Sequence, residues 1–247
     1  MAEILKDLRG SILTLTLNRP EKQNAIKREM YQTMADAINE AKGDFAIRAV
    51  MICSSGPHFT SGNDLYDFLN SPPLEPGSPV MNFLEAIHEF PKPLLAAVSG
   101  NAVGIGTTML MHCDVVVASP TARFSMPFVN LGLVPEAGSS LLFPRMVGHL
   151  RASKIFLTGE SFGPEFALSS GLINEIADDP IASAMTIAEK IAAQPPNAVI
   201  QTKALIKSEL HDKVAAVMRA EGELFQMALQ SDEAREAFMN FLAKKGK

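Results

Sequence analysis

The stretch GNAVGIGTTMLMHCDVVVASPTARFSMPFVNLGLVPEAG, residues 100–138, decides how the rest of the chain is interpreted. It begins with a loop in which glycines alternate with larger residues, from Gly100 to Gly106. Glycine lets a backbone approach a ligand closely, and the N-terminus of a following helix offers unpaired N–H groups and the positive end of its dipole. A β-rich run, residues 115–117, comes next, and the stretch ends in a loop that carries one acid, Glu136. It therefore predicts a site that stabilises developing negative charge beside a carboxylate.

The bulk composition limits the classes of protein to which the chain can belong. It has 247 residues, of which 47% are hydrophobic, enough for one large domain with a full core. The formal net charge of −5 argues against nucleic-acid binding, because such proteins usually present a basic face. No apolar run reaches about 18 residues, so no membrane span is expected. Cys53 and Cys113 lie in apolar surroundings and are expected to be reduced thiols, and a reducing cytoplasm is the expected location.

Alternating strand and helix patterns predict an α/β fold with a largely parallel sheet. The expected strands are residues 3–8, 12–17, 46–53, 94–98, 115–117 and 172–176. Helical periodicity predicts helices at residues 24–42, 65–69, 80–89, 139–147 and 150–158, and then at 181–193, 197–210, 214–228 and 232–243. We divide the chain into a core, residues 1–195, and a C-terminal helical region, residues 196–247.

Two glycine-containing loops carry the first candidate chemistry. Ser61-Gly62-Asn63 and the segment 103–106 each follow an apolar strand of the same predicted sheet. Each loop could aim a backbone N–H at one oxygen, which together would make an oxyanion hole. The alternative is that both are ordinary turns. The second loop lacks the G-x-G-x-x-G spacing of a dinucleotide site.

Glu136 is the second candidate. Pro135 precedes it and small residues follow, so it lies in a loop rather than on a helix face. Its neighbours are apolar, and an apolar pocket would raise its pKa and suit it to proton transfer. The alternative is a solvated charge or a partner of a helix N-terminus. The five histidines show no metal-ligand spacing, so no metal site is expected.

Several motifs of the chain resemble those of a known family, the crotonase (enoyl-CoA hydratase/isomerase) superfamily. The matching motifs are Asn18-Arg19-Pro20 with Asn24-Ala25, Phe59-Thr60-Ser61-Gly62-Asn63-Asp64-Leu65, Pro91-Lys92-Pro93, Ser99-Gly100-Asn101-Ala102-Val103-Gly104-Ile105-Gly106, Cys113-Asp114, Leu157-Thr158-Gly159 and Ala167-x-x-x-Gly171-Leu172. They occur in the family's order between about residues 15 and 176. As a set, they are highly specific for the superfamily.

The resemblance implies a crotonase-like spiral of ββα units, a C-terminal helical trimerisation region and a CoA thioester as ligand. The thioester oxygen would lie between the N–H groups of Asn63 and Ile105, and no cofactor beyond the CoA of the substrate is implied. CoA would contact Lys22, Gln23, Asn24, Ala25, Ser61, Gly62, Asn63, Asp64 and Leu65. The acyl pocket is expected to include Leu69, Phe83, Thr108, Phe128 and Leu131.

The resemblance also bears on the reaction. Hydratases of the family carry two glutamates, but here the corresponding positions hold Thr108 and Phe128, which cannot act as acid or base. Glu136 instead resembles the acid of peroxisomal-type Δ3,Δ2-enoyl-CoA isomerases. This predicts conversion of 3-enoyl-CoA to trans-2-enoyl-CoA in fatty acid β-oxidation. The alternatives are enoyl-CoA hydration or another crotonase-type reaction, and an acyl-CoA-binding protein with little activity.

Assembly is predicted from the last two helices. Their apolar residues Phe225, Leu229, Phe238, Phe241 and Leu242 exceed what the rim of a monomer should expose. The resemblance implies a homotrimer, or a hexamer made of two trimers. Lys244 or Lys245 of a neighbouring subunit could then approach the CoA phosphates.

Overall fold

The computed structural model describes residues 2–70 and 77–245, without the side chains of residues 68–70 and 241–245. In this part of the chain, strands form one six-stranded sheet, whose order is β1 (Ile4–Arg9), β2 (Ile12–Leu17), β3 (Ala49–Ser54), β4 (Leu94–Val98), β6 (Val115–Ala118) and β8 (Glu175–Ile176). β1 is antiparallel to β2, and every other neighbouring pair is parallel. The predicted, largely parallel sheet is thus confirmed.

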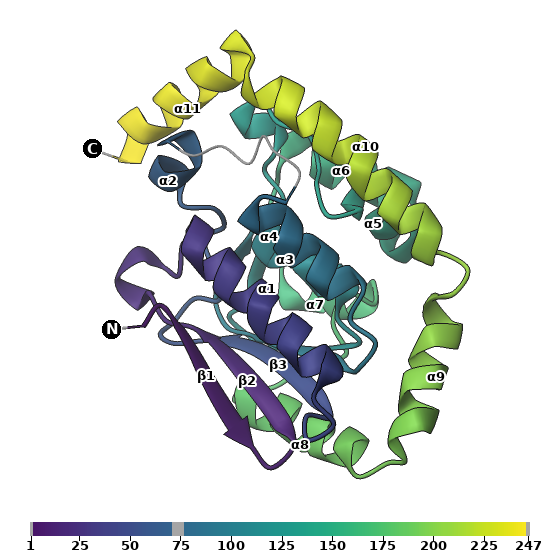
Figure 1. Cartoon of the computed structure of the whole chain (residues 1–247). Helices are drawn as coiled ribbons and strands as arrows, with labels where there is room; N and C mark the ends of the chain where they lie inside the picture. Colours follow the sequence, from purple (N-terminus) through teal and green to yellow (C-terminus); the bar gives the residue numbers. More distant parts are fainter. Residues whose placement is uncertain (1, 71–76, 246–247) are drawn as a thin grey trace.

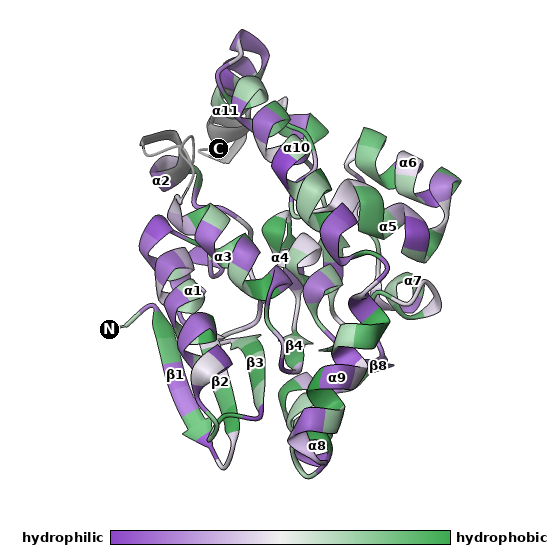
Figure 2. Ribbon diagram, turned by 45° about the vertical axis from the view of Figure 1, so that its right-hand side comes forward, coloured by the Kyte–Doolittle hydropathy of each residue, from purple (hydrophilic) through white to green (hydrophobic). Residues whose placement is uncertain are grey.

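Both faces of this sheet are covered, which explains the continuous apolar run of its central strands. In β3, Val50 and Ile52 point into the larger core, whereas Met51 and Cys53 point into a smaller one. The helices α1 (Arg28–Gly43) and α3 (Pro79–His88) contribute to the larger core, and α8 (Pro180–Ala192) covers the other face. Figure 1 shows α1 in front of the strands and α8 behind them. In Figure 2 the central strands are largely hydrophobic, whereas the edge strand β1 also carries hydrophilic residues.

A second, small sheet was not predicted from the sequence. It pairs β5 (Asn101–Val103) with β7 (Arg123–Ser125) in parallel, and Thr60 bridges to Ala102 beside them. Strands of three residues are too short to show a periodic pattern. Each of β3, β4 and β6 is therefore followed by a short extended piece next to this second sheet, and then by a helix. The helices concerned are α2 (Leu65–Asn70), α4 (Ile105–Thr108) and α5 (Ser139–Val147).

The C-terminal third is helical, as predicted. After the 3-10 helices η2 (Met109–His112) and η3 (Val129–Leu131), the chain forms α6 (His149–Thr158), α7 (Pro164–Ser169), α9 (Pro196–Lys207), α10 (His211–Leu229) and α11 (Asp232–Lys245). The predicted strand at residues 172–176 is shorter in the structure, because the N–H groups of Leu172 and Ile173 bond back to the Ala167 carbonyl. Among the described residues, no helix is long and apolar enough to cross a membrane.

The apolar residues of the last two helices are not placed as expected. Phe225 and Phe238 are buried within the chain itself, at 6% and 2% exposure, because α10 and α11 fold back over the core. Phe241 and Leu242 have side chains outside the described part. On α9, by contrast, Leu205 and Ile206 are exposed. Figure 1 shows α9 along one side of the molecule and α10 and α11 across its top.

Two family-like motifs have structural roles. Lys92 is buried, and its Nζ donates to three backbone carbonyls at the end of α1 and in the loop after it. Asp114 Oδ2 accepts from the Leu94 N–H at 2.8 Å and from Lys203 Nζ at 2.6 Å. Lys203 also donates to the Lys92 carbonyl, and burial lowers its pKa to about 8. This network fastens α9 to the core.

Candidate functional site

The two glycine-containing loops meet because of the register of the small sheet. Thr60 and Ala102 are partners in a parallel bridge, and Asn63 and Ile105 each lie three residues further along their segments. The two segments run in the same direction from this bridge, so residues the same number of positions beyond it lie next to each other. The backbone N–H groups of Asn63 and Ile105 are therefore expected on neighbouring turns at the same end of the small sheet. Both residues line a cavity of about 360 Å³. Neither N–H donates a hydrogen bond to another described residue.

Hydrogen bonds on both sides of Asn63 fix its backbone. The Ile26 N–H donates to the Gly62 carbonyl, and the Asp64 N–H donates to the Ile26 carbonyl, each at 2.9 Å. The neighbours of Asn63 thus face Ile26, which leaves the Asn63 N–H directed away from it. The Asn63 side-chain oxygen accepts a hydrogen bond from the hydroxyl of Tyr31, a buried residue of α1.

The loop of residues 19–25 is attached to this strand by a buried arginine. Arg19 Nη1 donates to the Ala25 carbonyl at 2.7 Å and to Asp64 Oδ2 at 3.0 Å, and Arg19 Nε lies 3.2 Å from Glu3. Burial alone would raise the pKa of Asp64, but the hydrogen bond and charge of Arg19 lower it below the ordinary value. Asp64 is therefore ionised and holds the loop in place.

The structure brings most of the expected CoA-contacting residues to the cavity, namely Lys22, Ala25, Ser61, Gly62, Asn63, Asp64 and Leu65. Two are placed elsewhere. The Asn24 side chain is fully buried, where it accepts from the Arg19 N–H and donates to the carbonyls of Ser55 and His58. Gln23 does not line the cavity, and its carbonyl accepts from the Ser61 N–H. Both residues join the two loops and do not form the wall.

The expected acyl pocket needs more correction. Phe128 and Leu131 line the cavity. Phe83 instead packs in the core against Tyr31, with ring centroids 5.5 Å apart. Thr108 is fully buried and lines neither this cavity nor the one beside Glu136. The side chain of Leu69 lies outside the described part. Residues from the last two helices, Phe225 and Phe238, complete the wall and were not predicted there.

Glu136 lies behind this wall. It is 7% exposed and lines a separate cavity of about 30 Å³, and Phe225 lines both cavities. Its Oε1 has no hydrogen-bond partner among the described residues. Burial, and then the charge of Glu221, raises the pKa of Glu136 from 4.5 to about 8. A carboxyl group with this pKa can both accept and release a proton near neutral pH.

The backbone after Glu136 is unusual. Ala137 and Gly138 have φ angles of +61° and +70°, in the left-handed region. The Ala137 carbonyl accepts a hydrogen bond from Nε2 of His112 at 2.7 Å, and α5 begins directly after Gly138. The first N–H groups of a helix have no partner inside the helix. A carboxylate from α10 supplies that partner here.

This carboxylate belongs to Glu221, which the sequence analysis missed. It accepts from the Gly138 N–H at 2.6 Å, from the Ser140 N–H at 2.9 Å and from the Ser140 hydroxyl. The sequence does contain a signal. The buried residues of α10 are Val214, Met218, Glu221 and Phe225, so an acid occupies the apolar face of the helix. Leu224, an apolar residue of the same helix, is by contrast 55% exposed.

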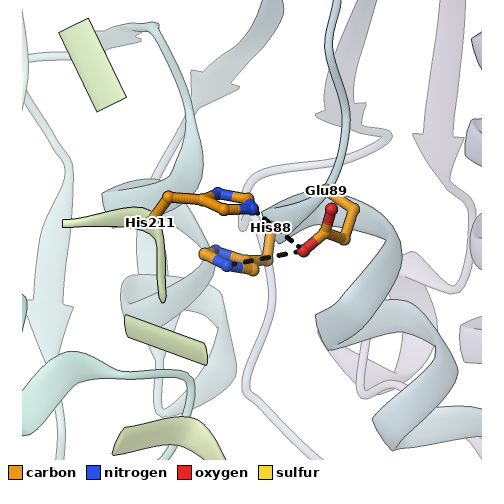
Figure 3. A group of neighbouring side chains, drawn as sticks. All are labelled: His88, Glu89 and His211. Carbon is orange, nitrogen blue, oxygen red and sulfur yellow. Dashed lines mark ion pairs between the residues drawn. The ribbon is translucent and has the colours of Figure 1, made fainter. Parts of the chain in front are cut away.

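A second group of titratable side chains lies at the other end of α10 (Figure 3). Oε1 of Glu89 lies 3.2 Å from Nε2 of His211 and 3.7 Å from Nε2 of His88. The two imidazole rings stack 4.5 Å apart with an interplanar angle of 11°. The lone pairs of imidazole nitrogens lie in the ring planes, so nearly parallel rings cannot direct both toward one cation. The geometry favours a tether between α3 and α10 over a metal centre.

Comparison with known proteins places this geometry in a family. The family model described as "Enoyl-CoA hydratase/isomerase" matches residues 7–247. Human "Enoyl-CoA delta isomerase 2" is 35% identical over 245 residues, which cover 96% of this chain and 62% of that protein. The chain thus spans about three fifths of the length of that relative. In Escherichia coli (strain K12), "1,2-epoxyphenylacetyl-CoA isomerase" is 32% identical and "2,3-dehydroadipyl-CoA hydratase" 31%, each over 99% of this chain and 97% of the relative.

Solved structures agree with the fold. An enoyl-CoA hydratase/isomerase from Pseudoalteromonas atlantica T6c superposes with a TM-score of 0.94 at 42% identity, covering 98% of both chains. OdaA from Pseudomonas aeruginosa has a TM-score of 0.95 at 44% identity, covering 98% of this chain and 99% of that one. The expected α/β crotonase fold is confirmed. Because the relatives include both isomerases and a hydratase, the comparison alone does not select a reaction.

Proposed function

Because the chain belongs to the enoyl-CoA hydratase/isomerase family, we propose that it acts on acyl-CoA thioesters and converts 3-enoyl-CoA to trans-2-enoyl-CoA, a step of fatty acid β-oxidation. The observation that carries this proposal is Glu136, a buried carboxyl group that has a pKa of about 8 and whose Oε1 has no hydrogen-bond partner among the described residues. Thr108 and Phe128 stand where the family's hydratases have carboxylates, so one acid must do all the proton transfer.

In the proposed mechanism, the thioester oxygen accepts hydrogen bonds from the N–H groups of Asn63 and Ile105. The Glu136 carboxylate takes a proton from C2, and the electron pair of that C–H bond delocalises onto the thioester oxygen. The same carboxyl group then returns the proton to C4, which leaves the double bond between C2 and C3. Each donor in such a hole contributes about 3 kcal/mol to the transition state. The positioned base adds about 10²- to 10⁴-fold in rate.

The position of Phe225 adds a requirement. This side chain lines both the larger cavity and the small cavity beside Glu136. An acyl chain whose thioester lies at Asn63 and Ile105 must therefore pass Phe225 to bring C2 and C4 to the carboxyl group. In this proposal, α10 forms the boundary that the acyl chain crosses.

The test is Glu136→Gln, which keeps the shape of the side chain and removes the base. With 3-enoyl-CoA as substrate, kcat should fall at least about 100-fold while KM changes little, because the lost interaction belongs to the transition state. Glu223→Gln, an exposed position on α10, is the matched control and should retain wild-type kcat. Wild-type kcat in the Glu136→Gln protein would show that the base lies elsewhere.

A second reaction is favoured by one specific finding, the similarity to a hydratase of E. coli. In that alternative, Glu136 would activate a water molecule for addition to 2-enoyl-CoA. Supplying 3-enoyl-CoA and crotonyl-CoA in separate assays distinguishes the two reactions. Efficient hydration of crotonyl-CoA by the pure protein would contradict the isomerase proposal, and consumption of neither substrate would favour an acyl-CoA-binding protein.

A further inference from the structure

Two buried carboxyl groups approach the same loop from distant parts of the chain. Glu136 belongs to the loop, and Glu221 extends from α10 with only 6% exposure. Their hydrogen bonding differs completely. Glu221 accepts from two backbone N–H groups and one hydroxyl, whereas Oε1 of Glu136 has no partner among the described residues. Burial raises the pKa of Glu221, but its three donors favour the ionised form and oppose that effect. Oε1 of Glu136 has no such donor in the described part of the chain, so of the two groups Glu221 carries the negative charge and Glu136 retains the proton.

We propose that Glu221 is a positioning residue for Glu136: it fixes the loop of residues 136–140 through three hydrogen bonds, and its negative charge holds the proton on Glu136. The proposal rests on the proposed role of Glu136 as the base. It gives α10 a role in the reaction, because this helix carries a charge that adds to the effect of burial and further raises the pH at which Glu136 loses its proton.

The other titratable groups near Glu136 cannot supply that charge. From α1, Tyr31 faces Glu136, and its burial, followed by the charges of Glu136 and Asp67, raises the pKa of its hydroxyl well above the ordinary value. From η2, His112 bonds to the Ala137 carbonyl, and burial lowers its pKa to about 3. Both side chains are therefore neutral at pH 7. Among the described residues, Glu221 is the charge that acts on Glu136.

The packing of α10 keeps this arrangement rigid. A Cβ atom added to Gly138 would lie 2.9 Å from Cγ1 of Val214 and 3.4 Å from Cγ of Met218. The backbone of the loop thus lies directly against the helix, with no room for a side chain between them. Glu221 is one turn further along the same buried face. The distance between the two carboxyl groups is set by this contact and not by flexible side chains alone.

The pH dependence of kcat/KM for 3-enoyl-CoA tests the proposal. The reaction needs ionised Glu136, so the wild-type rate should rise with pH around the pKa of about 8. In Glu221→Gln the charge is gone, and the midpoint of this rise should move down by about one pH unit or more. The maximal rate should also fall. Glu221 accepts from the Gly138 N–H with one oxygen and from the Ser140 N–H with the other, and the single oxygen of an amide leaves its NH2 group facing one of these donors. Glu221→Asp keeps the charge and should restore the high midpoint, and Glu223→Gln on the exposed face should leave it unchanged.

A purely structural role would lower the rate of Glu221→Gln without moving the midpoint, and that result would overturn the proposal. If Glu221→Gln does not fold, the charge on Glu221 is measured in the wild-type protein. Carbon NMR of the glutamate carboxyl groups should show Glu221 ionised at pH 7 and Glu136 titrating near pH 8, and the step near pH 8 should be lost in Glu136→Gln. A Glu221 carboxyl group that is still protonated at pH 7 would overturn the proposal. Wild-type activity in Glu136→Gln would instead refute the proposed function itself.

Discussion

His112 provides a measurable dependence of stability on pH. Its ring is 2% exposed, and Nε2–H donates to the carbonyl of Ala137 at 2.7 Å. Burial is the main reason that the pKa of His112 falls from 6.5 to about 3, and the charges of Lys207 and Lys203 act in the same direction. The folded protein therefore keeps this ring neutral at pH values where the unfolded chain protonates it.

The sign and size of the effect follow from linkage. Between about pH 6.5 and 3 the unfolded chain binds more protons at this site than the folded protein, so stability decreases as the pH falls. At pH 7 the contribution of His112 is fully present. At pH 5 about 2 kcal/mol of the free energy of unfolding should be lost through this residue alone.

Urea unfolding followed by circular dichroism, at one protein concentration and at pH 5, 6, 7 and 8, measures this loss. His112→Gln can donate its amide N–H to the same carbonyl but does not titrate. The difference between wild type and variant should therefore change by about 2 kcal/mol from pH 7 to pH 5, while the other titrating groups cancel. His149→Gln, at an exposed position, should run parallel to wild type. Parallel curves for wild type and His112→Gln would refute the reasoning.

Two further predictions concern the loop and the assembly. Gly138→Ala combines a φ of +70° with a clash against α10, whereas Gly171→Ala has a φ of +78° and no described atom within 4 Å of the added Cβ. Gly171→Ala should lower the free energy of unfolding by about 1 kcal/mol, and Gly138→Ala by at least about 2 kcal/mol more; equal losses in urea titrations would contradict the packing of α10 on this loop. Leu205 and Ile206 on α9 are 76% and 77% exposed, and we expect such surface to be covered in a trimer or hexamer. Light scattering that reports a 26.6 kDa species at micromolar concentration would contradict this expectation.

Local patterns determined much of the fold. The continuous apolar run of β3 is typical of a central strand of a parallel sheet, and its residues on both faces, such as Met51 and Ile52, are buried. The second sheet could not be predicted, because its strands have three residues each and are too short to show an alternating pattern. The shortened β8 follows from a turn around Ala167, whose carbonyl competes for N–H groups that a strand would use.

Some residues of the candidate site could be identified from local sequence, and others could be placed only by the tertiary structure. The two glycine-containing loops and Glu136 could be named from the sequence because glycines, a proline and apolar neighbours occur there within a few residues. Within those loops, the resemblance to the family singled out Asn63 and Ile105. The role of Asn24 could not be assigned from the sequence, because the sequence does not show whether an amide side chain contacts a ligand or backbone groups. In the structure it donates to two backbone carbonyls. Phe225 could not be assigned either, since an apolar stripe on a helix does not say which surface will cover it.

The sequence by itself determined the parallel α/β core, the two glycine-containing loops and the acid in the third loop, because each depends on residues close together in the chain. Only the tertiary structure placed Glu221 beside that acid and Phe225 between the two cavities. The Glu221 hydrogen bond to Gly138 joins residues 83 positions apart. The pKa of Glu136 depends on burial and on that distant charge, and both exist only after α10 has packed against the loop.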